Sequence, residues 1–304
     1  MPVLSRRARL LALATLLALA AISLVAVLLR PGAPPSLDQP ATLPSPPANA
    51  EVLLAVGDIG SCSGEADEAV ATLASRLPGS IAVLGDIVYE EGSAQNFESC
   101  FEPAWGPMRS RMHPTPGNHE YEVRDASPYY DWFGAAAGRR GEGWYSFDLG
   151  AWHVVALNSN CAFVGGCREG SAQLEWLQDD LAAHPSDCLL AFWHHPRYSS
   201  GRHGSLRQTE EIWLTLVRAG MDVALAGHDH SYERVAAGDT REFVVGTGGR
   251  SLYRFENATL PSTETRHDGS YGLLWLALGE GTYQWQFVPL GVTLFSDSGT
   301  GDCA

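Results

Sequence analysis

Apolar residues occur along this chain in short continuous runs that alternate with amphipathic stretches. The runs that predict strands are residues 52–56, 81–84, 144–149, 152–158, 189–193, 223–226, 243–245, 271–278 and 283–290. Helical periodicity occupies residues 65–77 and 171–183, and Ser171 is a suitable N-cap for the second helix. Helices between buried strands predict an α/β domain made of two packed sheets flanked by helices.

The N-terminal segment has a different pattern. Residues 10–29 are apolar without interruption, and arginines at positions 6, 7 and 9 precede them. A helix of this length spans a bilayer core, and the arginines favour a cytoplasmic start with an external body. Residues 1–30 are therefore expected to be an uncleaved signal anchor, which would contact the membrane, or a cleaved signal peptide. Residues 31–50 are rich in Pro, Ala and Ser and predict a linker before one domain at 51–304.

Charge excludes one class of partner. The chain has 20 basic and 35 acidic residues and a net charge of −15. Within residues 51–304 there are 16 basic and 34 acidic residues, and such a surface repels nucleic-acid backbones. We expect no nucleic-acid partner, and no sequence feature indicates a protein partner. A small anionic substrate would need a local positive charge, which clustered metal ions supply.

Six cysteines fit an exported protein, because an oxidising compartment permits disulfides and their number is even. They lack the CxxC pairs of a zinc site. Cys161 and Cys167 would close a short Gly-containing loop and are the first candidates for a bridge. Buried free thiols are the alternative. The pairing stays open for Cys62, Cys100, Cys188 and Cys303.

Five segments present metal-binding side chains, and four of them follow predicted strands directly. The segments are Gly57-Asp58-Ile59-Gly60, Gly85-Asp86-Ile87-Val88-Tyr89, Gly117-Asn118-His119-Glu120, Trp193-His194-His195 and Gly227-His228-Asp229-His230. One Gly-Asp pair is uninformative, because Asp and Gly are common in turns. Together the segments offer the oxygens that hard cations prefer and the imidazoles that suit borderline ions. They predict a metal site beyond the carboxyl ends of the strands.

The order of these segments resembles that of the calcineurin-like metallophosphoesterase superfamily, and specifically its purple acid phosphatase branch. The patterns Gly-Asp-x-Gly, Gly-Asp-x-x-Tyr, Gly-Asn-His-Glu, His and Gly-His-x-His occur in this order between Val52 and Tyr232. The resemblance implies that residues 51–304 form a four-layer α/β/β/α sandwich. The chain resembles the small single-domain form of the family, because the segment before Gly57 is too short for the extra β domain of larger members.

The resemblance also implies a binuclear metal centre. Its pattern divides seven ligands between two ions, with one shared carboxylate: Asp58, Tyr89 and His230 for the first, Asn118, His194 and His228 for the second, and Asp86 for both. A tyrosine ligand favours Fe(III), paired with Fe, Zn or Mn(II). The alternative for Tyr89 is an aromatic packing residue.

Two adjacent histidines compete for one ligand position. The family pattern of His, any residue, then Pro fits His194-His195-Pro196, so His194 is the expected ligand and His195 lies beside the site or in solvent. His203 follows His194 by nine positions, where small purple acid phosphatases place the histidine that protonates the leaving group. A solvated loop histidine is the alternative for His203.

Further substrate contacts follow from the same resemblance. His119 would contact the substrate phosphate and stabilise transition-state charge, and Asn118 and His203 would also contact the substrate. Glu120 is expected to orient a neighbour as a hydrogen-bond acceptor. Three arginines near His203 are read either as a clamp for an anion or as ordinary surface charge: Arg197, Arg202 and Arg207.

Together, these features predict a metal-dependent phosphoric monoester hydrolase. A metal-bound water or hydroxide would hydrolyse a phosphate monoester by in-line attack, as in an acid phosphatase. The nearest alternative is a phosphodiesterase or nucleotide hydrolase with the same metal cage. A binding module without turnover and a redox iron protein are further alternatives, but all seven ligand positions are filled, which argues against the binding module.

Overall fold

The structure is a computed structural model that describes residues 43–62 and 64–303. The predicted signal anchor or signal peptide at residues 1–30, and most of the predicted linker, lie outside this part. Residues 43–50 form no helix or strand, and β1 begins at Glu51. In the described part of the chain, no helix has the length and apolar character needed to cross a membrane.

A strand forms at each of the nine runs expected from the sequence, and further strands lie between them. Their bounds are β1 (Glu51–Val56), β2 (Gly60–Ser61), β3 (Ser80–Leu84), β4 (Val88–Tyr89), β5 (Met112–Thr115), β6 (Tyr145–Leu149), β7 (Trp152–Ala156), β8 (Leu189–Phe192), β9 (Met221–Ala226), β10 (Tyr232–Ala237), β11 (Thr240–Val245), β12 (Thr263–His267), β13 (Gly272–Gly279), β14 (Thr282–Pro289) and β15 (Ser298–Asp302).

The helices include both predicted ones. The α-helices are α2 (Ala66–Ser75), α3 (Ala94–Asn96), α4 (Glu102–Ala104), α5 (Ser127–Phe133), α6 (Ala172–Ala183) and α7 (Glu210–Arg218). Short helical turns are η1 (Phe97–Phe101), η2 (Gly106–Arg111), η3 (His119–Glu122), η4 (Arg124–Ala126) and η5 (Gly134–Ala137). Ser171 caps α6 as expected, because its hydroxyl oxygen accepts a hydrogen bond from the Leu174 amide at 3.4 Å.

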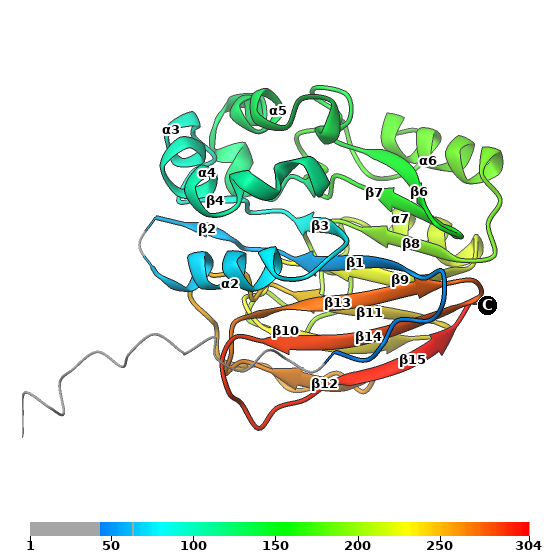
Figure 1. Cartoon of the computed structure of the whole chain (residues 1–304). Coiled ribbons are helices and arrows are strands. Elements are labelled where there is room, and N and C mark those ends of the chain that lie inside the picture. The colour runs from blue at the N-terminus through cyan, green and yellow to red at the C-terminus, as the bar shows by residue number, and fades with distance from the viewer. Residues whose placement is uncertain (1–42, 63, 304) are drawn as a thin grey trace, which may run out of the picture. The chain divides into compact units, whose positions relative to one another are not determined.

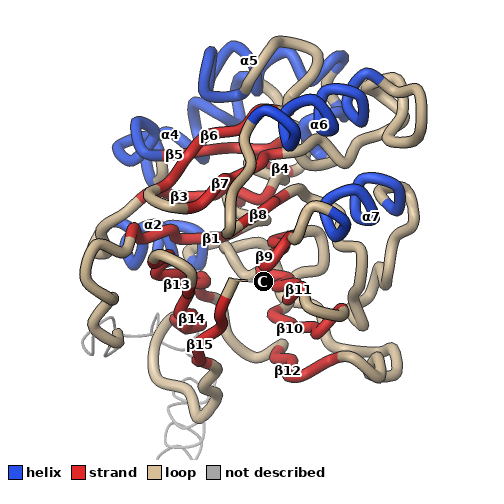
Figure 2. The backbone as a smooth tube through the Cα atoms, turned by 90° about the vertical axis from the view of Figure 1, so that its right-hand side faces the viewer, coloured by secondary structure: helices blue, strands red, loops and turns tan. Residues whose placement is uncertain are grey.

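Two large sheets pack face to face. One has the strand order β15-β14-β13-β1-β3-β5, and the other has the order β12-β10-β11-β9-β8-β7-β6. Helix α2 covers the outer face of the first sheet, and α6 and α7 cover the outer face of the second (Figures 1 and 2). This arrangement confirms the expected four-layer α/β/β/α sandwich.

The core between the sheets explains why the apolar runs are strands. Alternate residues of each central strand face the opposite sheet, as Leu53 and Ala55 of β1 do, and the intervening residues face a helical layer. Both kinds are buried, so these strands are continuously apolar. Inter-sheet positions on other strands include Leu84, Leu190, Phe192, Leu225, Phe243, Leu276 and Trp285.

All six cysteines form disulfides, so the alternative of free thiols is wrong. The predicted bridge between Cys161 and Cys167 is confirmed. The pairs that the sequence left open are Cys62–Cys100 and Cys188–Cys303.

Candidate metal centre

Loops at one end of the sandwich bring all seven predicted metal ligands together. The central strands of each sheet run parallel, so their carboxyl ends meet at the same edge. Asp58 follows β1, Asp86 follows β3, Tyr89 ends β4, Asn118 follows β5, His194 follows β8, and His228 and His230 follow β9.

The first half of the cluster surrounds the phenol of Tyr89. Its hydroxyl oxygen lies 2.8 Å from Asp58 Oδ1 and 3.0 Å from Asp86 Oδ2, and its single proton can be donated to either carboxylate. Nε2 of His230 lies 3.3 Å from the same hydroxyl and 3.3 Å from Asp58 Oδ1. Three acidic oxygens and one imidazole nitrogen therefore share one small volume.

The second half surrounds the Nε2 atom of His194. Asn118 Oδ1 lies 3.1 Å from it, and Nδ1 of His228 lies 3.2 Å from it. Asp86 Oδ2 is 3.3 Å away, and this is the same oxygen that contacts Tyr89. Asp86 thus touches both halves, the position expected for a bridging carboxylate.

Strained backbone places these side chains. Asp58, Asp86 and His228 have left-handed φ values of 60°, 48° and 68°, and each follows a glycine at a strand end. Close packing also requires the absence of a side chain at Gly117, where a Cβ would lie 2.1 Å from Asp86 Oδ1. The Gly-Asp and Gly-His pairs therefore turn the chain so that the side chains converge.

Backbone carbonyls fix the imidazole ligands. Nδ1 of His194 donates to the Leu84 carbonyl at 2.7 Å, and Nδ1 of His230 donates to the Ser251 carbonyl at 2.8 Å. Each bond leaves the Nε2 lone pair directed into the cluster, as in histidines that bind metals.

Electrostatics favour a bound cation in the cluster. Burial raises the pKa of Tyr89 well above its ordinary value, and the carboxylates of Asp58 and Asp86 raise it further. Burial also opposes charge on Asp86 and His194, but their mutual attraction outweighs it, raising the pKa of His194 to about 9 and holding that of Asp86 far below its usual range. A metal ion supplies the same positive charge, so the buried oxygen and imidazole donors fit divalent or trivalent ions.

Glu120 joins two of the ligand loops. Its carboxylate accepts hydrogen bonds from the amides of Ile87 at 2.8 Å and Gly117 at 2.7 Å. Burial, followed by the charge of Asp86, raises the pKa of Glu120 to about 7. The expectation that Glu120 accepts hydrogen bonds is confirmed, although it holds backbone amides rather than a ligand side chain.

The two predicted catalytic histidines flank the cluster on different sides. The His119 ring lies 4.4 Å from the Tyr89 ring, and its Nε2 lies 3.8 Å from Asp86 Oδ2. The His203 ring lies 4.3 Å from the His228 ring, and the His203 amide donates to Asp229 Oδ1 at 2.8 Å. Both rings therefore lie against residues of the cluster.

The arginine cluster expected near His203 is only partly formed. Arg197 is buried, donates to Glu210 at 3.1 Å, and lies over the Tyr198 ring, so it does not face the cluster. Arg202 lies 5.0 Å from the centroid of Tyr253. Arg197, which is paired with Glu210, therefore serves the fold rather than an anion site, and among the described residues Arg207 makes only a backbone hydrogen bond, from the Glu210 amide to its carbonyl at 3.0 Å.

Sequence reasoning missed two residues at the mouth of the cluster. Tyr253 stacks on the His230 ring at 4.1 Å, and the Arg250 guanidinium lies 4.9 Å from the Tyr89 ring centroid. Both lie in the loop after β11, which begins Gly246-Thr247-Gly248-Gly249. A glycine-rich loop after a buried strand was the available signal.

Comparison with known proteins agrees with the geometry. Residues 52–232 match the family model described as calcineurin-like phosphoesterase. Purple acid phosphatase 23 of Arabidopsis thaliana is 30% identical over 234 residues, which cover 64% of this chain and 49% of the relative. The probable inactive purple acid phosphatase 9 of the same plant is 23% identical over 60% of this chain and 35% of its own length.

A solved structure shows the same fold. The purple acid phosphatase PPD1 from yellow lupin seeds superposes with a TM-score of 0.73 at 18% identity, covering 83% of this chain and 53% of that chain. The chain spans about half the length, or less, of these plant relatives. Because the family match covers more than half of its residues, this chain belongs to the calcineurin-like phosphoesterase family, and within that family it resembles the purple acid phosphatases.

Proposed function

We propose that this protein binds two metal ions and hydrolyses phosphate monoesters, as an acid phosphatase does. The observation that carries the proposal is the position of Asp86 Oδ2, which lies 3.0 Å from the Tyr89 hydroxyl and 3.3 Å from His194 Nε2. One carboxylate oxygen therefore belongs to two adjacent donor sets, as a binuclear site requires.

The two donor sets differ in chemistry. Asp58, Tyr89 and His230 form a set rich in anionic oxygen, which suits Fe(III). The second set has the Asn118 amide and two imidazoles, which suit a divalent Fe, Zn or Mn ion: Asn118, His194 and His228. Metal ions held by these residues would supply Lewis acidity for the transfer of the phosphoryl group to water.

The residues around the cage bind and orient the ester. His119 donates a hydrogen bond to a phosphoryl oxygen on the Tyr89 side, and the Asn118 amide contacts the phosphoryl group on the other. His203 lies over His228 with its ring exposed, so it can give a proton to the departing alkoxide and recover one from solvent.

The compartment follows from the cysteines. Three disulfides persist in an oxidising environment, and we place the protein outside the cytoplasm for that reason. The substrate is then a small phosphate ester available in that compartment.

A paired assay tests the proposed function. The metal-loaded protein is given a phosphomonoester and a phosphodiester that share the nitrophenol leaving group, and the visible spectrum of the sample is recorded. We expect faster hydrolysis of the monoester and a phenolate-to-Fe(III) band that Tyr89→Phe abolishes. Preferential cleavage of the diester by a colourless protein would replace the phosphatase by a phosphodiesterase with the same cage.

Loss of the shared carboxylate provides the control. Asp86→Asn keeps the shape of the side chain but removes its negative charge and replaces one carboxylate oxygen with an amide nitrogen, which cannot bind a cation. We expect turnover to fall at least about a hundredfold, the scale of a lost catalytic group. Substantial turnover by this variant would refute the bridging role.

A further inference from the structure

His195 is a histidine beside the cluster to which the proposed mechanism gives no role. Its ring lies 4.8 Å from the ring of His194 and 4.5 Å from the ring of His228. The residue is 8% exposed, so most of its surface is packed against the protein. A buried imidazole next to two proposed metal ligands needs hydrogen-bond partners of its own.

Ser159 fixes the orientation of this ring. The His195 amide donates to Ser159 Oγ at 3.0 Å, and Ser159 Oγ lies 2.8 Å from His195 Nδ1. Ser159 is fully buried, so its hydroxyl proton needs an acceptor within the protein. Among the described residues, the acceptor within hydrogen-bond distance of this hydroxyl is Nδ1 of His195. The hydroxyl therefore donates to Nδ1, and a neutral His195 carries its own hydrogen on Nε2.

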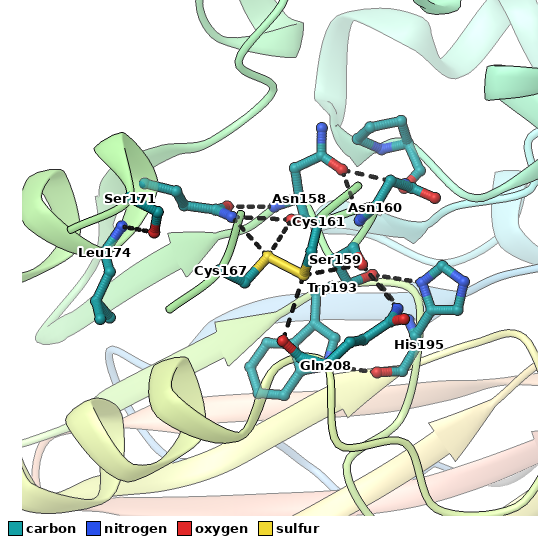
Figure 3. Close-up of a disulfide and its surroundings, with 12 residues drawn as sticks. Asn158, Ser159, Asn160, Cys161, Cys167, Ser171, Leu174, Trp193, His195 and Gln208 are labelled. Carbon is teal, nitrogen blue, oxygen red and sulfur yellow. Dashed lines mark hydrogen bonds between the residues drawn. A yellow bond between two sulfur atoms is a disulfide. The ribbon is translucent and has the colours of Figure 1, made fainter. Parts of the chain in front are cut away.

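The segment that carries Ser159 is anchored on several sides. Gln208 Nε2 donates to the Ser159 carbonyl at 2.8 Å, and Asn160 Nδ2 donates to the Pro116 carbonyl, next to the Asn118 loop, at 3.0 Å. The Cys161–Cys167 disulfide closes the following loop, and Figure 3 shows Ser159 between this bridge and His195. Ser159 is thus held rigidly, which preorganises His195.

The remaining donor of His195 has no partner among the described residues. The Nδ1–Ser159 bond leaves the Nε2 hydrogen uncommitted, on a ring packed beside His194 and His228. A protonated nitrogen cannot coordinate a metal ion, which excludes His195 as an eighth ligand in this tautomer. One ring nitrogen each of His194, His195 and His228 lie within 4.8 Å of one another, so the His195 ring borders the cluster and its N–H can donate to an oxyanion bound there.

We infer that His195 is a further substrate-contacting residue, whose Nε2–H donates a hydrogen bond to a phosphoryl oxygen, and that Ser159 is its positioning residue. The inference rests on the proposed function. His195 would be the third histidine to contact the substrate, beside His119 and His203, and it lies on the side of the cage formed by His194 and His228. The ligand it recognises is the tetrahedral phosphoryl group itself, common to substrate and product.

Binding of inorganic phosphate to the metal-loaded protein tests this without turnover. The measurement is calorimetric titration of two variants, with metal content determined on the same samples. His195→Leu removes the donor, and we expect phosphate to bind about tenfold to a hundredfold more weakly, the factor for one lost hydrogen bond to a charged group. His195→Gln keeps an N–H donor near the position of Nε2 and should retain most of the affinity.

The outcomes separate the roles of His195. Unchanged phosphate affinity in His195→Leu, or an equal loss in both variants, would overturn the inference. A loss of bound metal in His195→Leu would also overturn it, because His195 would then be a ligand. If the wild-type protein binds phosphate in this way but hydrolyses no ester, the proposed function fails while the donor role of His195 stands.

Ser159→Ala tests the positioning role. Without the hydroxyl the ring samples both tautomers and other orientations, so phosphate should bind about threefold to tenfold more weakly at unchanged metal content. Ser146→Ala is the matched control, because it removes a hydroxyl that donates to Asp180 Oδ1 at 2.7 Å away from the cage. Equal phosphate affinity in Ser159→Ala and Ser146→Ala would overturn the role of Ser159.

Discussion

At the scale of single residues, Asp86 carries the most structural constraint in the site. Its backbone has a left-handed φ of 48°, and its Oδ1 accepts the His119 amide at 2.9 Å. Gly117 leaves the space that its carboxylate fills. These constraints direct Oδ2 to both donor sets, so the bridging position is built by the backbone.

The contribution of His203 to kcat should be larger for esters whose leaving group must be protonated as it departs. An alkoxide leaves poorly unless protonated, whereas a nitrophenolate leaves without help. We expect His203→Ala to reduce kcat for an alkyl phosphate about a hundredfold, and for nitrophenyl phosphate less than about tenfold. His184→Ala, at the exposed end of α6, is the control. Equal losses on both esters would show that His203 does not protonate the leaving group.

Asp67 gives the stability a defined pH dependence. Burial raises its pKa from 3.8 to about 6, and its Oδ1 has no hydrogen-bond partner in the described residues. The folded state therefore holds this proton more tightly than the unfolded state, so the contribution of Asp67 to stability falls as the pH rises from 4 through 6.

Asp67→Asn removes this titration. The unfolding free energy of the variant minus that of the wild type should rise by about 2 kcal/mol between pH 4 and pH 7, measured by urea titration. Glu175→Gln, at an exposed position of α6, is the matched control, because its carboxylate does not contribute to the pKa of Asp67. A difference that is constant with pH would contradict the assignment.

Part of the site could be predicted from the sequence. The seven ligand candidates were predictable because each follows a glycine or strand end in a short, ordered pattern. The link between Ser159 and His195 was not, because 36 positions separate them and only the fold brings them together. The position of Tyr253 beside the site could not be predicted for the same reason, because stacking on His230 leaves no pattern in the local sequence.

At the scale of elements, prediction succeeded where burial makes a strand continuously apolar. β5 was missed because its sequence, Met112-His113-Pro114-Thr115, is short and contains proline. It lies at the edge of its sheet, where proline is tolerated. Helix α7 was missed although it carries the buried Ile212, Trp213 and Leu216, because nine residues give few helical repeats.

The disulfides should differ in their contribution to stability. Cys188–Cys303 ties β8 to the chain after β15 across 115 positions, whereas Cys161–Cys167 spans 6. Loss of loop-closure entropy in the unfolded chain predicts a stabilisation of about 5 kcal/mol for the longer loop and about 2 kcal/mol for the shorter one.

Paired alanine variants measure this difference. Cys188→Ala with Cys303→Ala should lower the unfolding free energy more than Cys161→Ala with Cys167→Ala, by urea titration under oxidising conditions. Equal losses would mean that local packing, rather than chain entropy, determines what each bridge contributes.

At the scale of the whole molecule, two sheets and their helices hold one rigid edge where the ligand loops meet. The body carries a net negative charge, so it does not attract an anionic ester by itself. Under the proposed function, the attraction would come from cations held in the cage, with Arg202 nearby, because the charge of Arg250 is already paired with Glu90. The proposed function therefore predicts that substrate binding depends on metal loading more than on the charge of the surface.

The number of metal ions needed for turnover tests whether the centre is binuclear. The metal-stripped protein is titrated with Fe and Zn while the hydrolysis of a phosphomonoester is recorded. Two donor sets joined by Asp86 predict no hydrolysis without metal and a rate that reaches its plateau at two ions per chain. Hydrolysis by the stripped protein, or a plateau at one ion per chain, would contradict the binuclear account.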